Sequence, residues 1–248
     1  MIGQVLPYCG APPVPGELLA RFNLDPVLIF VLTGLLIGHV HAANGRRAQL
    51  LAAGGWLVAA VALISPLCAL SVALFSARVA QHMVLVLIAA PLIAAAWPIA
   101  ARHYSPWRVW GAAAAFFAAL WLWHMPAPYD STFTSTTLYW AMHVTLFGSA
   151  ILLWRELLHH CASRTAEVLA VGLFTSMQMG LLGAVLTLAG HPVFLWHLTT
   201  SAAWGFTALQ DQQLGGVLMW IPGIGLFLFA AMRSLSRLWT VLETEKPA

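Results

Sequence analysis

Seven apolar segments, each near the length that crosses a bilayer, follow one another along the chain at near-regular intervals. A helix needs about 20 apolar residues to cross the hydrocarbon core. A soluble core cannot absorb a chain that is 61% hydrophobic and only 8% charged. The segments do not alternate polar and apolar residues as barrel strands do, and backbone in lipid must satisfy its own hydrogen bonds, so we expect helices. They run from about Pro26 to Ala43, Ala48 to Leu67, Val79 to Trp97, Trp107 to Trp123, Leu138 to Leu157, Val168 to Leu188 and Gly215 to Leu235. The sequence therefore predicts an all-α, polytopic membrane helix bundle with about seven transmembrane helices.

The basic residues fall unevenly on the two sides of this predicted bundle. One side carries Arg46, Arg47, Arg102, Arg108, Arg155, Arg164, Arg233, Arg237 and Lys246. The other side carries Arg21 and Arg78. The positive-inside rule then places the N-terminus outside and the C-terminus in the cytoplasm. We predict an extracytoplasmic segment over residues 1–25, a seven-helix transmembrane domain over 26–240 and a cytoplasmic tail over 241–248.

Charge and motif content argue against several classes of function. The net charge is +3, but no stretch clusters more than two basic residues, so we expect a lipid bilayer around the chain and no nucleic-acid partner. The chain has no GxSxG, Walker A or HExxH string and no paired carboxylates, so we expect no enzymatic activity. The three cysteines form no CxxC motif, and the sequence leaves open whether Cys9 and Cys68 pair.

Histidine is the most informative residue type, because an ionisable side chain at membrane depth marks a functional site by default. Three of the ten histidines fall in the outer third of three different predicted helices, and each is next to a methionine. These pairs are His82 with Met83, His124 with Met125, and His143 with Met142. Imidazole with thioether suits copper, particularly Cu(I), whereas the scarcity of carboxylates argues against calcium or magnesium. The alternative is that the histidines bond between helices and the methionines fill the bundle interior.

Several other polar residues can be interpreted as structural. His39 and His41 lie about 200° apart around one predicted helix, so they cannot face one site. Asp211 precedes the last predicted helix, where it can cap that helix. Asp130 can cap a short outer helix or orient a histidine.

Several strings in the outer half resemble the CtaG-like family of cytochrome c oxidase assembly factors. They are AQHMVLVLIAAPLIAAAWP (80–98), LWHMPAPYDSTF (122–133), LYWAMHVTLF, MGLLGAVLT (179–187) and DQQLGGVLMWIPG (211–223). The resemblance implies a multi-spanning plasma-membrane protein that assembles caa-type cytochrome c oxidase, with a copper-related role. It places the family's polar motif residues at His82, His124, Tyr129, Asp130, His143, Asp211 and Gln212. Arg78 departs from the family pattern, which often has a histidine there, and could hold an anion.

We therefore expect an assembly factor of the bacterial plasma (inner) membrane that binds or delivers copper at its outer face to haem-copper oxidase subunits. His82, His124 and His143 are the expected ligands, with Met83, Met125 or Met142 completing a soft site. Three alternatives stay open. The first is a membrane haem protein that uses two of the histidines as axial ligands, with Arg78 at a propionate. The second is a copper transporter that uses His39 and His41 on the inner side. The third is a scaffold whose histidines are structural.

Overall fold

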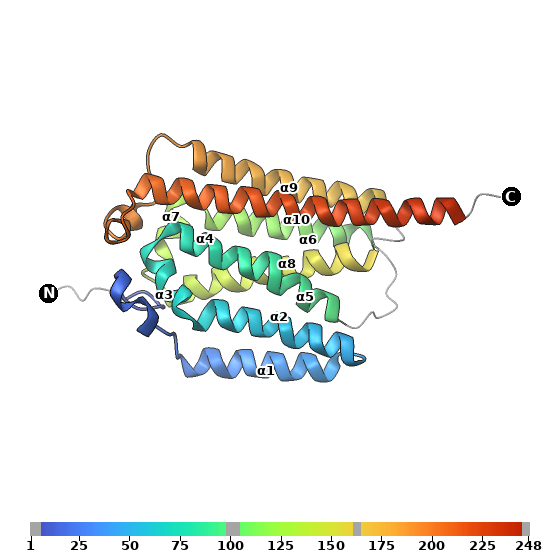
Figure 1. Ribbon diagram of the computed structural model, residues 1–248, viewed down its shortest axis with the longest axis horizontal. Helices are drawn as coiled ribbons and strands as arrows, with labels where there is room; N and C mark the ends of the chain where they lie inside the picture. Colours follow the sequence, from blue (N-terminus) through green and yellow to red (C-terminus); the bar gives the residue numbers. More distant parts are fainter. Residues whose placement is uncertain (1–5, 98–104, 161–164, 245–248) are drawn as a thin grey trace.

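The computed structural model describes residues 6–97, 105–160 and 165–244 and is 82% helical. Within these ranges there is no β-strand. Long helices lie side by side with their axes nearly aligned, as Figure 1 shows. One end of the bundle carries the start of the first helix, a short helix and the loops at 189–207; we call it the N-terminal end.

The helices follow one another in a simple order. They are η1 (Pro15–Ala20), α1 (Pro26–Ala42), α2 (Arg46–Ile64), α3 (Pro66–Ala73), α4 (Phe75–Met83), η2 (Val84–Ala89), α5 (Ala90–Ala96), α6 (Pro106–Trp123), α7 (Pro126–Ser131), α8 (Thr136–His160), α9 (Thr165–Leu188), η3 (Leu195–Leu198), η4 (Ser201–Trp204) and α10 (Ala208–Thr244). The all-helical prediction is confirmed.

Four helical segments of the described chain are long and apolar enough to cross a membrane. They are Arg46–Ile64, Phe75–Ala96, Thr136–Leu158 and Ala166–Leu188. Helix α1 is apolar but shorter, with 17 residues. The number of seven spans and the orientation stay predictions. Arg102, Arg164 and Lys246, which contribute to the predicted orientation, lie outside the described residues.

Several predicted boundaries are wrong, and capping residues explain one of them. The largest difference is at the last helix, which runs from Ala208 to Thr244 and not from Gly215 to Leu235. The sequence predicts that the second segment reaches Leu67, but α2 ends at Ile64 because Ser65 begins a new helix. The Ser65 hydroxyl accepts a hydrogen bond from the Leu67 amide, and Pro66 occupies the first helical position. The third segment begins at Phe75, one turn before the expected start at Val79.

Helices α4, η2 and α5 form one continuous segment with a π-helical centre. The Ala90 N–H donates to the Leu85 carbonyl, five residues back. The Val86 carbonyl would take its donor from Pro91 in that register, but proline has no N–H. Instead, the buried indole N–H of Trp154 on α8 donates to the Val86 oxygen at 2.8 Å. The proline and the tryptophan together account for the π segment just after His82.

Replacing Trp154 with phenylalanine should leave the Val86 carbonyl without this donor. We expect a loss of about 1 to 2 kcal/mol in stability, a few degrees in the unfolding midpoint followed by far-UV circular dichroism in detergent. Trp107→Phe is the control, because Trp107 is 86% exposed. Equal midpoints for the two variants would contradict this role for Trp154.

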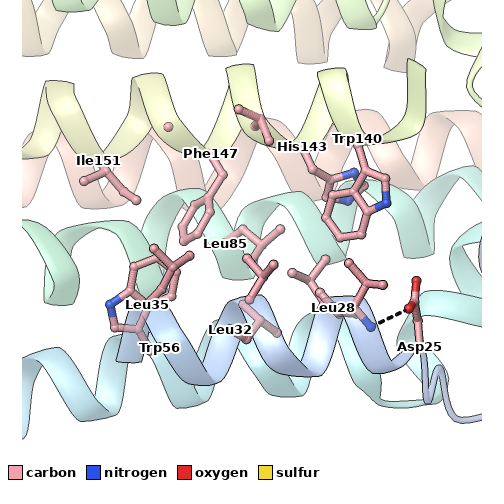
Figure 2. Close-up of a pocket in the computed structure, with 15 residues that line it drawn as sticks. Asp25, Leu28, Leu32, Leu35, Trp56, Leu85, Trp140, His143, Phe147 and Ile151 are labelled. Carbon is pink, nitrogen blue, oxygen red and sulfur yellow. Dashed lines mark hydrogen bonds between the residues drawn. The ribbon is translucent and has the colours of Figure 1, made fainter. Parts of the chain in front are cut away.

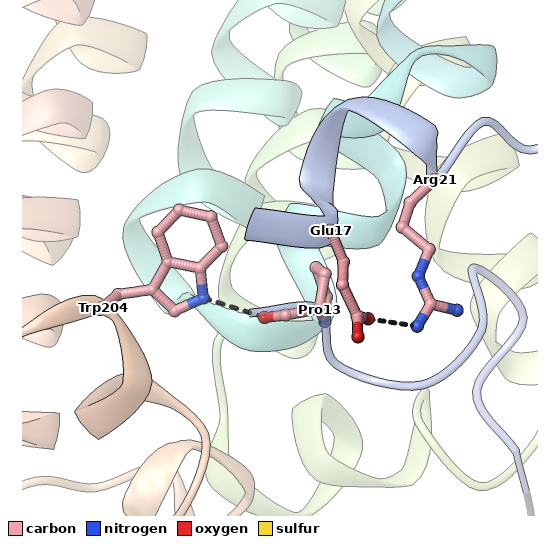
Figure 3. A network of polar contacts seen from close by, with 4 residues as sticks. All are labelled: Pro13, Glu17, Arg21 and Trp204. Carbon is pink, nitrogen blue, oxygen red and sulfur yellow. Dashed lines mark hydrogen bonds and ion pairs between the residues drawn. The ribbon is translucent and has the colours of Figure 1, made fainter. Parts of the chain in front are cut away.

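The N-terminal segment is fastened to the N-terminal end of the bundle. A disulfide joins Cys9 to Cys68 on α3. The Trp204 indole N–H donates to the Pro13 carbonyl at 3.0 Å, as Figure 3 shows. The ion pair of Glu17 with Arg21 in the same view is exposed and adds little to stability. The question that the sequence leaves open about the cysteines is thus answered: they pair.

Candidate metal centre

Three histidines from three elements meet near the N-terminal end of the bundle. His82 lies on α4, His124 is the C-cap of α6, and His143 lies on α8. The ring centroid of His82 is 5.3 Å from that of His143 and 6.3 Å from that of His124. Each side chain is at least 94% buried. We call this group the histidine cluster; it contains all three of the histidines that the sequence singles out.

Hydrogen bonds fix two of the three rings and leave nitrogen atoms free. The Nδ1–H of His124 donates to the Leu120 carbonyl at 2.7 Å, and that of His143 donates to the Tyr139 carbonyl at 3.0 Å. Since a carbonyl only accepts, both rings carry their hydrogen on Nδ1 when neutral, and Nε2 keeps its lone pair. The Nε2 of His143 and both ring nitrogens of His82 are buried without a hydrogen-bond partner. An unpaired buried polar group costs about 1 to 3 kcal/mol, so the arrangement needs a reason.

The three methionines beside these histidines are placed differently from one another. Met142 is fully buried and Met83 is 8% exposed, and both belong to the main hydrophobic core. Met125 is 50% exposed at the N-cap of α7. Adjacent helical residues point about 100° apart, yet Met142 and His143 both lie on the buried side of α8, whereas Val144 next to them is 66% exposed. Met83 and Met142 are therefore enclosed near the cluster's level, whereas Met125 lies at the surface.

The rings as placed do not form a finished metal site. Among the residues that the structure describes, no group of three or more His, Cys, Asp or Glu side chains is arranged so that it could hold a metal ion. Leu85, Val86 and Leu146 pack beside His82 and His143 and leave no room for a water molecule. The cluster thus has unpaired donors in a closely packed setting, and its rings must turn before three of them could share one ion.

Arg78 is a buried cation one helical turn before His82. Its side chain is 1% exposed, and its Nη1 donates to the Thr132 hydroxyl at 2.6 Å. The guanidinium carbon lies 3.9 Å from the ring centroid of Phe133 and 5.1 Å from that of Tyr129, which is cation–π geometry. No carboxylate of the described chain forms an ion pair with it. Aromatic faces therefore take the place of a counter-ion.

Asp211 caps a helix other than its own, which corrects the expectation from the sequence. It lies inside α10, where Thr207 and Gln210 already form a reciprocal capping box. Its buried carboxylate accepts from the Phe75 amide at 2.6 Å, and from the amide and hydroxyl of Ser76 at 3.0 and 2.5 Å. These are the first residues of α4. Asp211 therefore anchors the helix that carries His82.

Tyr129 and Asp130 tie α7 to the loop before α10. The Tyr129 hydroxyl donates to Nε2 of His197 at 2.7 Å, because the Nδ1 side of that ring faces the Ala73 carbonyl. The Asp130 carboxylate accepts from the amides of Leu195 and Trp196, so it caps η3 and does not orient a histidine. Burial lowers the pKa of His197 to about 3, which keeps the ring neutral and this contact intact at ordinary pH.

Gln212 and two glycines join α10 to its neighbours. The Gln212 side chain accepts from the Val193 amide and donates to the Leu186 carbonyl. A Cβ on Gly215 would lie 2.4 Å from the Phe75 ring, and a Cβ on Gly216 would lie 2.7 Å from the Gly183 carbonyl. The backbones of α9 and α10 meet here at a distance that only glycine allows.

A protein-family model described as cytochrome c oxidase caa3 assembly factor, Caa3_CtaG, matches residues 35–240. The chain belongs to this family. No curated protein and no solved structure matches the sequence. The resemblance drawn from the motif strings is thereby confirmed, and the Caa3_CtaG match reaches from α1 into α10.

The motif residues of this Caa3_CtaG protein fall into two groups. Tyr129, Asp130, Asp211 and Gln212 all have protein partners and hold loops and helix ends together. The histidine cluster forms the other group, in which three ring nitrogens are buried without a partner; single unpaired nitrogens also occur at Arg78, His39 and Trp121. A ligand for the chain is therefore to be sought at the cluster.

Sequence reasoning missed two residues that support the site. His197 receives the Tyr129 hydroxyl, and the only signal for it is the string LWH, which occurs at 122–124 and again at 195–197. Tyr139 stacks against His143 with centroids 4.2 Å apart, and its hydroxyl lies 3.4 Å from the sulfur of Cys9. Tyr139 lies in the string LYWAMHVTLF, but nothing in that string assigns it a role, because its role depends on contact with the disulfide.

Proposed function

We propose that this Caa3_CtaG protein binds a copper ion at the histidine cluster and hands it to a haem-copper oxidase during assembly, at the outer face of a bacterial plasma membrane. The family supplies the assembly role and implies contact with the oxidase. In this proposal the chain spans the membrane seven times, with the N-terminal end outside, and has no catalytic activity.

The observation that carries the proposal is the set of unpaired nitrogen atoms. His82 has two buried ring nitrogens without a partner, and His143 has one. Two imidazoles that share a metal ion, each about 2.0 Å from a nitrogen, have ring centroids on the order of 5 to 6 Å apart. The centroid distances of 5.3 and 6.3 Å lie near that range. The residues present fit a metal ion, and rotation of the rings is what binding requires.

The charges around the cluster favour a singly charged ion. Imidazole and thioether are neutral ligands, and Arg78 places a permanent positive charge four residues before His82 on the same face of α4. A second positive charge on the ion would add repulsion in a buried setting, where electrostatic interactions are strong. Cu(I) is also the ion that soft sulfur and imidazole ligands select.

The packing around the cluster favours an ion over a macrocycle. The space beside His82 and His143 has no room even for a water molecule, whereas pockets that hold small molecules and cofactors measure roughly 300 to 1,000 Å³. A metal site with few ligands, whose rings must rearrange to bind the ion, is also suited to releasing that ion. Transfer to the oxidase requires that the ion leave again, which a closed cage would prevent.

Copper binding can be tested on His82→Leu. Purified metal-free protein in detergent is mixed with Cu(I) and ascorbate, and the affinity is measured by competition with a chromophoric Cu(I) chelator. We expect about one copper per chain for the wild type and an affinity at least tenfold weaker for the variant. Because His82 makes no hydrogen bond, the thermal midpoint of His82→Leu should be unchanged or higher.

His191→Leu is the matched control, since His191 is exposed in the loop after α9. It should bind Cu(I) like the wild type. The copper site would be refuted if the wild type bound no Cu(I), or if His82→Leu and His191→Leu bound it with equal affinity. Normal oxidase activity in cells that carry His82→Leu would instead indicate a scaffold that needs no metal.

A further inference from the structure

An apolar groove runs along the side of the bundle between α1 and α8. Its volume is about 440 Å³, and its walls include Leu28, Leu32, Trp56 and Phe147, with Leu85 at the bottom. Figure 2 shows these side chains facing one another across the groove. His143 of the histidine cluster forms part of its wall.

The shape and lining of the groove suit a hydrocarbon chain. On α1 the lining residues run from Val27 to Leu35, which is about 12 Å of helix, and the lining side chains along this stretch are all apolar. A linear hydrocarbon chain is narrow enough to lie in it.

One end of the groove carries a negative charge. Asp25 and Trp140 line it there, as Figure 2 shows. The Asp25 carboxylate accepts from the Tyr8 hydroxyl at 2.5 Å and from the Val27 amide at 2.8 Å, and these hydrogen bonds lower the pKa of Asp25. No Lys, Arg or His of the described chain pairs with it. The carboxylate is therefore ionised, held in place and free to meet a cation.

We propose that this groove binds one phospholipid with a primary ammonium head group, phosphatidylethanolamine in type. One of its two acyl chains lies between α1 and α8, and the ammonium lies against Asp25. The carboxylate provides the charge complement for the head group, and the indole of Trp140 at the same end is a surface on which an ammonium group is attracted. The lipid fills the gap between the two helices. Its head group, next to Asp25, places the N-terminal end of the bundle at the level of the lipid head groups.

Native mass spectrometry of metal-free protein tests the proposal. The protein in mild detergent is incubated with equal amounts of phosphatidylethanolamine and phosphatidylcholine that carry the same acyl chains. The wild type should retain one lipid and favour the ethanolamine head group roughly two- to fivefold, because a primary ammonium donates hydrogen bonds to the Asp25 carboxylate and the quaternary ammonium of choline has no N–H to donate. Asp25→Asn, which preserves an N-cap oxygen for α1, should retain both lipids equally.

Gly148→Leu and Gly54→Leu form the matched pair. A Cβ at either glycine meets no atom within 4 Å, but only Gly148 lines the groove. Gly148→Leu should lose the bound lipid, whereas Gly54→Leu should retain it. Equal retention by these two variants, no head-group preference in the wild type, or a second copy of the chain bound in place of lipid would overturn the proposal. Because no copper is present, the outcome does not depend on the proposed function.

Discussion

Asp211→Ala should lower the stability of the protein by roughly 3 to 5 kcal/mol, among the largest effects of any single substitution. The carboxylate accepts three hydrogen bonds from the start of α4, and the residue is fully buried, so water cannot replace it. In thermal unfolding followed by tryptophan fluorescence in detergent, the midpoint should fall on the order of 10 °C.

Glu17→Ala is the control for loss of an acidic side chain. Its ion pair with Arg21 is exposed, so the midpoint should hardly move. Asp211→Asn should lie between the wild type and Asp211→Ala, because one acceptor oxygen remains. Since Asp211 anchors the helix that bears His82, Asp211→Ala should also weaken copper binding. A midpoint for Asp211→Ala equal to that of Glu17→Ala would contradict the cap.

Gly216→Ala and Gly225→Ala should change stability in opposite directions, although both lie on α10. A Cβ at Gly216 would be 2.3 Å from the Thr187 hydroxyl oxygen and 2.7 Å from the Gly183 carbonyl, so α9 and α10 must separate. Overpacking of this kind costs about 1 to 3 kcal/mol. A Cβ at Gly225 meets nothing within 4 Å, and alanine there should stabilise the helix by about 0.5 to 1 kcal/mol.

The test for this pair is whether one variant is less stable and the other more stable than the wild type. Thermal midpoints of both variants, measured in the same detergent, should bracket the wild type. If Gly216→Ala melts at or above the wild-type temperature, α9 and α10 do not need the close approach that the structure shows.

The candidate site was predictable as far as helix periodicity and side-chain chemistry allow. Depth along each helix placed His82, His124 and His143 at one level, and the structure brings their rings together. The partners of Asp211 were not predictable. Its position near the start of a helix suggests a local cap, but its acceptors meet the amides of α4, a helix that lies about 135 residues earlier in the chain.

Hydrophobic run length determined that this chain forms an apolar helical bundle, because each run must satisfy its own backbone hydrogen bonds wherever it is buried. The motif strings determined its family. Only the tertiary structure decided that Cys9 bonds to Cys68, that Trp154 completes the π segment and that Asp211 caps α4. Each of these contacts joins groups that are far apart in sequence, and the close approach of helices that creates them is set by side chains on several elements at once.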